Sequence, residues 1–166
     1  IGRIMGRMAL EKGARQLVIW DINEQNIAAT EVALSPLGKV KGYKVNVADH
    51  AAVEQAFRTT TEECGDVDIL INCAGIVTSN KTFDEQSLSD IERTMAINAT
   101  APMVVALQAL PPMIKRDKGH ICNIASAAGM ISNPRMSVYA ASKWAVIGWS
   151  DSVRIELQER KSNVHF

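Results

Sequence analysis

The sequence predicts an α/β fold with a doubly wound parallel sheet that helices cover on both faces. Short continuous apolar runs, such as 17–20 and 69–71, alternate with longer segments of helical periodicity. Apolar runs without a polar side are typical of strands buried on both faces, and strands separated by helices pair in parallel. Because 166 residues suit one core, we predict a single domain over 1–166.

The predicted elements of the first half follow from periodicity and capping residues. We predict helices at 3–12, 23–34 and 49–64, and strands at 17–21, 40–47 and 67–71. Asp21 ends the first of these strands. Asp49 is a good N-cap for the helix that runs to Cys64.

The second half continues the alternation. We predict a helix over 87–115 with interruptions near Pro102 and Pro111, a strand over 119–124 and a long helix over 139–160. The chain begins at a helix and stops at 164–166, which is typical of the start of a buried strand. We therefore expect the sequence to be an internal piece of a longer protein.

Composition excludes several classes of function. Eighteen basic residues balance eighteen acidic residues, so no net charge attracts nucleic acid or an anionic membrane. No apolar run approaches the roughly 18 to 20 residues of a membrane span. Three cysteines and three scattered histidines form no disulfide framework and no metal-ligand cluster, so we expect a cytoplasmic protein with reduced thiols and no metal.

Two groups of residues suggest chemistry. Gly2 begins a helix and Asp21 ends the next strand 19 residues later, as in a dinucleotide-binding turn whose acid binds the ribose. Tyr139 and Lys143 share one helical face, because residues four apart lie one above the other. A free tyrosine has a pKa of about 10, and a nearby cation favours the phenolate. Such a pair can move a proton, although each motif alone also has a purely structural explanation.

Four motifs together carry a family resemblance. They are Asn72-Cys73-Ala74-Gly75, Asn98 in Met95-Ala-Ile-Asn-Ala99, Ser126 in Ile124-Ala-Ser-Ala-Ala-Gly129, and Tyr139-Ala-Ala-Ser-Lys143. In this order they resemble the short-chain dehydrogenase/reductase family across the whole chain. The resemblance implies a Rossmann-type, three-layer α/β/α fold, of which the sequence lacks the first strand and the C-terminal part. Because that strand lies mid-sheet in the family, the isolated 166 residues are expected not to melt cooperatively.

The resemblance also implies catalytic roles. Tyr139 would be the general acid in reduction and the base in oxidation, and Lys143 would lower its pKa and bind the nicotinamide ribose. Ser126 would hold the substrate oxygen, as a developing alkoxide requires. Asn98 would shape the helix beneath the site and support a proton-relay water.

For the cofactor, the resemblance assigns several positions. Gly2 matches the last glycine of the phosphate loop, and Asp21 matches the acid that selects NAD, because a carboxylate repels the 2′-phosphate of NADP. NADP stays possible, since part of the glycine loop lies outside the sequence. The remaining cofactor-binding positions are Asn46, Val47, Asn72, Ala74, Gly75, Tyr139 and Lys143. Asn46 replaces the family's usual Asp, and Cys73 replaces the second Asn of its turn.

The substrate is predicted as a class only. The chain is similar to retinol and hydroxysteroid dehydrogenases and to bacterial 3-oxoacyl-carrier-protein reductases. We favour a lipophilic secondary alcohol or ketone. Four apolar residues near the serine and tyrosine either form a pocket wall or pack under a loop; these are Met130, Ile131, Met136 and Val138.

Two other functions are weighed against a simple dehydrogenase. A non-catalytic dinucleotide-binding protein would not need Ser126, Tyr139 and Lys143 together. An extended-branch epimerase or dehydratase is disfavoured by the turn at 72–75. The resemblance also implies a homodimer or homotetramer paired through the helices of Asn98 and Tyr139. Residues of the last helix support a second apolar face; these are Trp144, Ile147, Val153 and Leu157.

Overall fold

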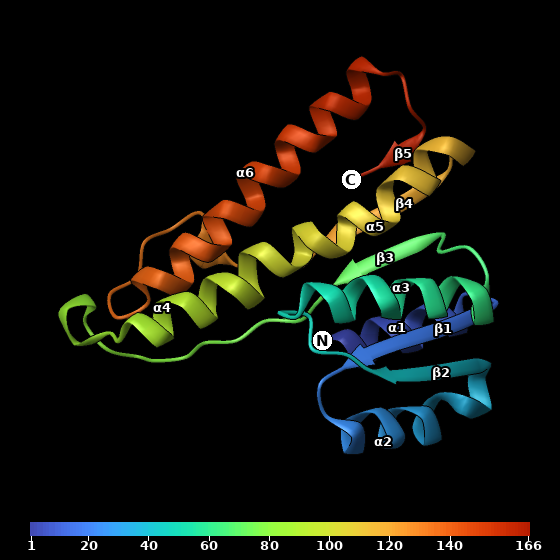
Figure 1. The fold of residues 1–166 in the computed structure, drawn as a ribbon, viewed down its shortest axis with the longest axis horizontal. Coiled ribbons are helices and arrows are strands. Elements are labelled where there is room, and N and C mark those ends of the chain that lie inside the picture. Colours follow the sequence, from blue (N-terminus) through green and yellow to red (C-terminus); the bar gives the residue numbers. More distant parts are fainter. The chain divides into compact units, whose positions relative to one another are not determined.

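The computed structural model describes residues 1–166, which divide into two compact units, 1–66 and 67–166. Each unit contains its own parallel sheet (Figure 1), with two strands in the N-terminal unit and three in the C-terminal unit. The parallel pairing and the alternation of strands with helices confirm the predicted α/β class. The single domain over 1–166 stays a prediction.

The N-terminal unit is a two-stranded parallel sheet with three helices. Its elements are α1 (Gly2–Glu11), β1 (Gln16–Asp21), α2 (Glu24–Leu34), a 3₁₀ turn (Ser35–Leu37), β2 (Lys39–Lys44) and α3 (His50–Cys64). The register runs from Gln16 opposite Lys39 to Asp21 opposite Lys44. All three helices contact β1, and they bury Leu10, Ile27, Leu34 and Val53.

Capping residues fix the boundaries in this unit. The Asn23 side chain accepts hydrogen bonds from the first turn of α2, and Asp49 caps α3 as predicted. Strand β2 is shorter than the predicted 40–47. It ends at Lys44 because Asn46 begins a turn, in which its side-chain oxygen accepts from the Ala48 N–H at 3.1 Å.

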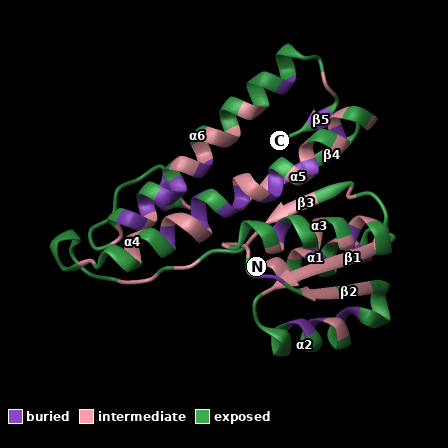
Figure 2. Cartoon of the chain, in the orientation of Figure 1, coloured by how far each residue is buried: buried purple, intermediate pink, exposed green.

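The C-terminal unit is a three-stranded parallel sheet in the order β3-β4-β5. Its elements are β3 (Ile69–Asn72), a 3₁₀ turn (Phe83–Glu85), α4 (Leu88–Met95), a π-helical turn (Ala96–Thr100), α5 (Ala101–Arg116), β4 (Gly119–Asn123), the 3₁₀ turn η4 (Ala127–Gly129), α6 (Ser137–Glu159) and β5 (Val164–His165). Helix α5 packs on β3 and β4, and α6 packs on α4 and the π-helical turn. Figure 2 shows that α6 is buried mainly in its N-terminal half, which packs on α4 and the π-helical turn, and that its C-terminal part is largely exposed.

The prolines act differently from the sequence prediction. The predicted interruption near Pro102 is a π-helical turn that lies just before it, and the predicted break at Pro111 is wrong, because α5 continues through Pro111 and Pro112. Pro111 cannot donate to the carbonyl of Leu107, so α5 continues there with one interior hydrogen bond fewer.

The π turn therefore leaves a continuous helical segment, Leu88–Arg116. Contrary to the expectation from apolar runs alone, this segment is long and apolar enough to span a membrane by length and composition, with a mean hydropathy of 1.3 over its best window. Of that window, 44% is buried, and the segment packs on the sheet and on α6 of its own unit. This packing explains its apolar composition.

Candidate functional site

The first turns of α6 carry the predicted tyrosine and lysine. Tyr139 is half-buried near the start of the helix, and Lys143 follows one turn later with only 5% exposure. The Lys143 ammonium lies 5.8 Å from the centre of the Tyr139 ring. It donates a hydrogen bond of 2.8 Å to the carbonyl of Ile124, directly after β4. The two side chains therefore lie near each other on one helix, as their spacing predicts, while their catalytic roles stay a prediction.

Ser126 lies after β4 at the start of turn η4. Its Oγ accepts a hydrogen bond of 3.2 Å from the backbone N–H of Ala128. An oxygen that accepts in this way keeps its own O–H available to donate to another oxygen.

The turn that follows Ser126 packs against α6. A Cβ on Gly129 would lie 2.9 Å from the backbone carbonyl carbon and oxygen of Lys143. This close approach requires a glycine. It fixes the serine turn against the helix that carries Tyr139 and Lys143.

Asn98 lies in the π-helical turn and is fully buried. Its side-chain amide pairs with the backbone of Ile76: the amide oxygen accepts from the Ile76 N–H and the amide nitrogen donates to the Ile76 carbonyl, each at 2.8 Å. The same amide nitrogen donates to Ser142 Oγ at 3.2 Å. Asn98 therefore joins the segment after β3 to α6. Its shaping role in a reaction stays a prediction.

The predicted cofactor positions lie in both units. In the N-terminal unit, Gly2 begins α1, and the side chain of its N-cap residue Ile1 makes no capping hydrogen bond to the first N–H groups. Asp21 ends β1 and accepts from the Asn23 N–H through one oxygen only. Asn46 uses its side-chain oxygen in a turn, and its amide N–H groups make no hydrogen bond within the chain. These donors and acceptors are of the types that the phosphate, ribose and base of a nucleotide bind, and the cofactor-binding roles stay predictions.

In the C-terminal unit, Gly75 borders the side chains of Asn98 and Lys143. A Cβ there would lie 3.5 Å from the amide oxygen of Asn98 and 3.6 Å from the ammonium of Lys143, so the glycine leaves the space beside both groups open. Asn72 uses its side chain for contacts within the protein. Its amide N–H groups donate to the Pro102 carbonyl and to Asn123 Oδ1, at 3.3 and 2.8 Å, and so brace the ends of β3 and β4.

Several residues of this site were not predicted from the sequence. Ser142 belongs to the motif Tyr139-Ala-Ala-Ser-Lys143. Its position three residues after Tyr139 was the one sequence feature that could have indicated a contact with the Tyr139 backbone. The role of Gly129 and the carbonyl of Ile124 had no sequence signal, because both depend on tertiary contacts. Of the four apolar residues near the site, Val138 is buried, while Met130 and Ile131 are about two-thirds exposed, at 65% and 66%.

The chain is similar to many known proteins. A family model described as short chain dehydrogenase matches residues 1–166. The chain is 34% identical over 160 residues to estradiol 17-beta-dehydrogenase 11 of Pongo abelii, covering 94% of this chain and 53% of that protein. It is 34% identical over 155 residues to 2-dehydro-3-deoxy-L-rhamnonate dehydrogenase (NAD(+)) of a Sphingomonas species, covering 93% and 60%.

Solved structures agree with these sequence relatives. A short chain dehydrogenase/reductase from Burkholderia phymatum in complex with NAD is 28% identical, with a TM-score of 0.93, over 99% of this chain and 58% of that one. The chain spans about half the length of the first curated relatives.

Proposed function

Because the chain belongs to the short-chain dehydrogenase family, we propose that it forms the catalytic and nucleotide-binding part of an oxidoreductase. The proposed reaction moves a hydride between a nicotinamide dinucleotide and a secondary alcohol or ketone. The observation that carries the proposal is the packing of the Ser126 turn, through Gly129, on the backbone of Lys143 one turn after Tyr139. A fold that only bound a nucleotide would not need this arrangement.

Each side chain has a defined task in this proposal. The bound nicotinamide supplies or accepts the hydride. Ser126 donates its O–H to the substrate oxygen, and the Tyr139 hydroxyl gives its proton to that oxygen in reduction and takes it back in oxidation. Lys143 places its positive charge 5.8 Å from the centre of the Tyr139 ring.

The test is the absorbance of the reduced nicotinamide at 340 nm in the full-length protein, with NADH or NADPH and a panel of ketones. Replacing Tyr139 by Phe removes the proton donor and is expected to lower kcat by about 10²- to 10⁴-fold, with cofactor binding retained. Cofactor binding without turnover on any substrate would favour a non-catalytic dinucleotide-binding protein.

We infer a lipophilic substrate from the apolar residues that follow Ser126. Met130 and Ile131 expose most of their side chains beside the serine turn, and exposed apolar groups at a site are typical of an apolar ligand. The names of equally similar relatives include a steroid dehydrogenase and a sugar-acid dehydrogenase, so these names do not distinguish a lipophilic from a polar substrate. A panel that contains a cyclic ketone, a 3-oxoacyl thioester and a sugar acid separates these classes by kcat/KM.

We propose NAD as the preferred cofactor because Asp21 keeps a free carboxylate oxygen at the end of β1. A carboxylate there repels a 2′-phosphate. The variant Asp21→Asn removes the charge and keeps the shape, and it is expected to tighten NADPH binding by about tenfold relative to NADH binding. Titration by reduced-nicotinamide fluorescence measures both Kd values.

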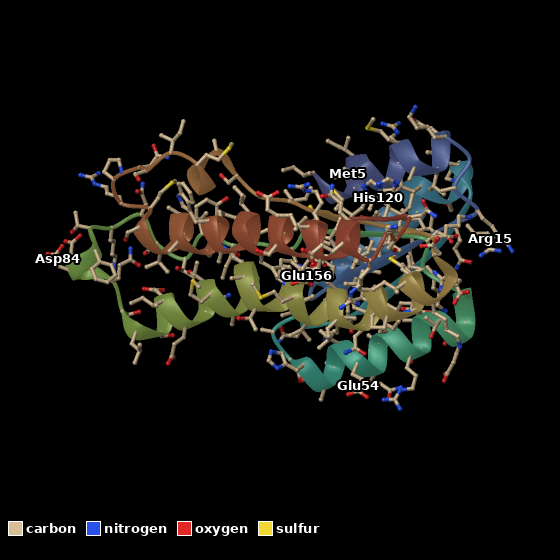
Figure 3. All side chains as sticks on the ribbon, turned by 90° about the horizontal axis from the view of Figure 1, so that it is seen from above. Met5, Arg15, Glu54, Asp84, His120 and Glu156 are labelled. Carbon is tan, nitrogen blue, oxygen red and sulfur yellow. The ribbon has the colours of Figure 1, made fainter.

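The proposed oligomer pairs through α5 and α6. Toward their C-terminal ends the two helices border a groove of about 400 Å³, lined by Leu107, Leu110, Pro111, Ile114, Lys115, Glu156 and Arg160. Figure 3 shows Glu156 on α6, alongside α5. Leu107 is 68% exposed, which favours a second copy as the occupant. Light scattering should find a dimer or tetramer that Leu107→Asp dissociates and that Val32→Asp, at an exposed position of α2, leaves intact.

A further inference from the structure

Ser142 is a buried hydroxyl for which the proposed reaction gives no role. It lies between Tyr139 and Lys143 on α6, and its side chain is fully buried. Its Oγ donates to the carbonyl of Tyr139 at 2.6 Å and accepts from the amide of Asn98 at 3.2 Å. Serines in helices commonly bond a carbonyl of their own helix, but the second partner on another element is a separate contact.

The direction of these hydrogen bonds follows from the chemistry of the groups. A carbonyl only accepts, so the single proton of Ser142 goes to Tyr139. Ser142 Oγ can then only accept from the third group, and the Asn98 side chain must turn its N–H toward α6. The contact with Ser142 therefore requires the same orientation of the Asn98 amide as the two contacts with the Ile76 backbone.

The opposite orientation of Asn98 is unfavourable at every contact. Turning the amide over would place its oxygen against the Ile76 carbonyl and against Ser142 Oγ, and its N–H groups against the Ile76 N–H. Buried polar groups without partners are costly. The network thus has one arrangement, which runs from Ile76 through Asn98 and Ser142 to the Tyr139 carbonyl.

We infer that Ser142 is a positioning residue for the proposed reaction: it ties the backbone of Tyr139, through Asn98, to the segment after β3. Lys143 has a different tether, the Ile124 carbonyl after β4. Loss of the Ser142 hydroxyl therefore disturbs the position of Tyr139, while Lys143 keeps its hydrogen bond to the Ile124 carbonyl. This inference rests on the proposed function, because it assigns Tyr139 the proton transfer.

The test compares variants at Ser142 in the full-length protein. Thr and Val have the same shape and differ by one hydroxyl, so Ser142→Thr and Ser142→Val isolate the hydrogen bonds from volume. Ser142→Ala removes the hydroxyl without added volume. The matched control is Ser152→Ala, because Ser152 Oγ bonds the Gly148 carbonyl of the same helix at 2.9 Å on the exposed side, with no second partner.

We expect Ser142→Ala and Ser142→Val to lower kcat by about tenfold, with the Kd for NADH unchanged, and Ser142→Thr and Ser152→Ala to keep kcat near the wild-type value. Wild-type kcat in Ser142→Val would overturn the inference, as would equal losses in the Thr and Val variants or a parallel loss of NADH binding. Absence of turnover in the wild type, or full turnover in Tyr139→Phe, would instead overturn the proposed function.

Discussion

Replacing Gly129 by Ala should separate the serine turn from the tyrosine helix. The added Cβ would lie 2.9 Å from the Lys143 carbonyl carbon and oxygen and 2.8 Å from Ile147 Cδ1. The side chain of Ile147 can rotate away, but the helix backbone at Lys143 cannot. Turn η4 must therefore move by about 0.5 Å to restore a contact of 3.4 Å.

The size of the effect follows from this displacement. Overpacking of this kind costs about 1–3 kcal/mol of stability. A misplacement of about 1 Å can cost about 10²-fold in rate, so about half that shift should lower kcat by about tenfold. The cause is a greater distance of Ser126 from Tyr139, so we expect the loss in kcat to exceed any loss in NADH binding.

The assay pairs steady-state kinetics with urea denaturation of the full-length protein. Gly148→Ala is the matched control, because Gly148 lies inside α6 and a Cβ there would meet nothing within 4 Å. That control should gain about 0.5–1 kcal/mol from the lower backbone entropy of alanine. Wild-type kcat and stability in Gly129→Ala would refute the argument from close packing.

Three further predictions concern stability. Gly42→Ala should destabilise the protein by about 1–3 kcal/mol in urea denaturation, because its Cβ would overlap the side chain of Ile27. The N–H and side-chain amide of Asn163 hold the pKa of Asp117 below its usual value, so stability should fall as pH drops through that lowered pKa, and melting of Asp117→Asn should lose this dependence. Burial raises the pKa of Tyr43, so stability should decline above the unfolded-state pKa of about 10, and denaturation of Tyr43→Phe at pH 9 and 11 should show a smaller decline.

Local rules were sufficient for the features that depend on neighbouring residues. The spacing of Tyr139 and Lys143, the cap at Asp49 and the end of β1 at Asp21 are all set by the geometry of a single element. Local rules failed at Pro111, because a proline predicts a break only from its missing N–H. Whether the helix continues depends on packing, and α5 packs along β3 and β4.

The polar network of the site lay beyond sequence reasoning for a related reason. Asn98 is 22 residues from Ile76 and 44 residues from Ser142, and no periodic pattern connects such distant positions. A serine beside a lysine in a helix is equally consistent with an exposed face. Only the arrangement of the segment after β3 against α6 makes Ser142 a partner of Asn98.

The structure also explains why a tyrosine and a lysine four residues apart do not by themselves make a site. One helix fixes their spacing, but each is held by a different strand end: Lys143 by the Ile124 carbonyl after β4, and Tyr139 by Ser142 and Asn98 to the segment after β3. The carboxyl ends of parallel strands are where α/β folds place their ligands. The two tethers therefore set the phenol and the ammonium relative to that edge, and a change in either strand end should alter the reaction even where the motif on α6 is intact.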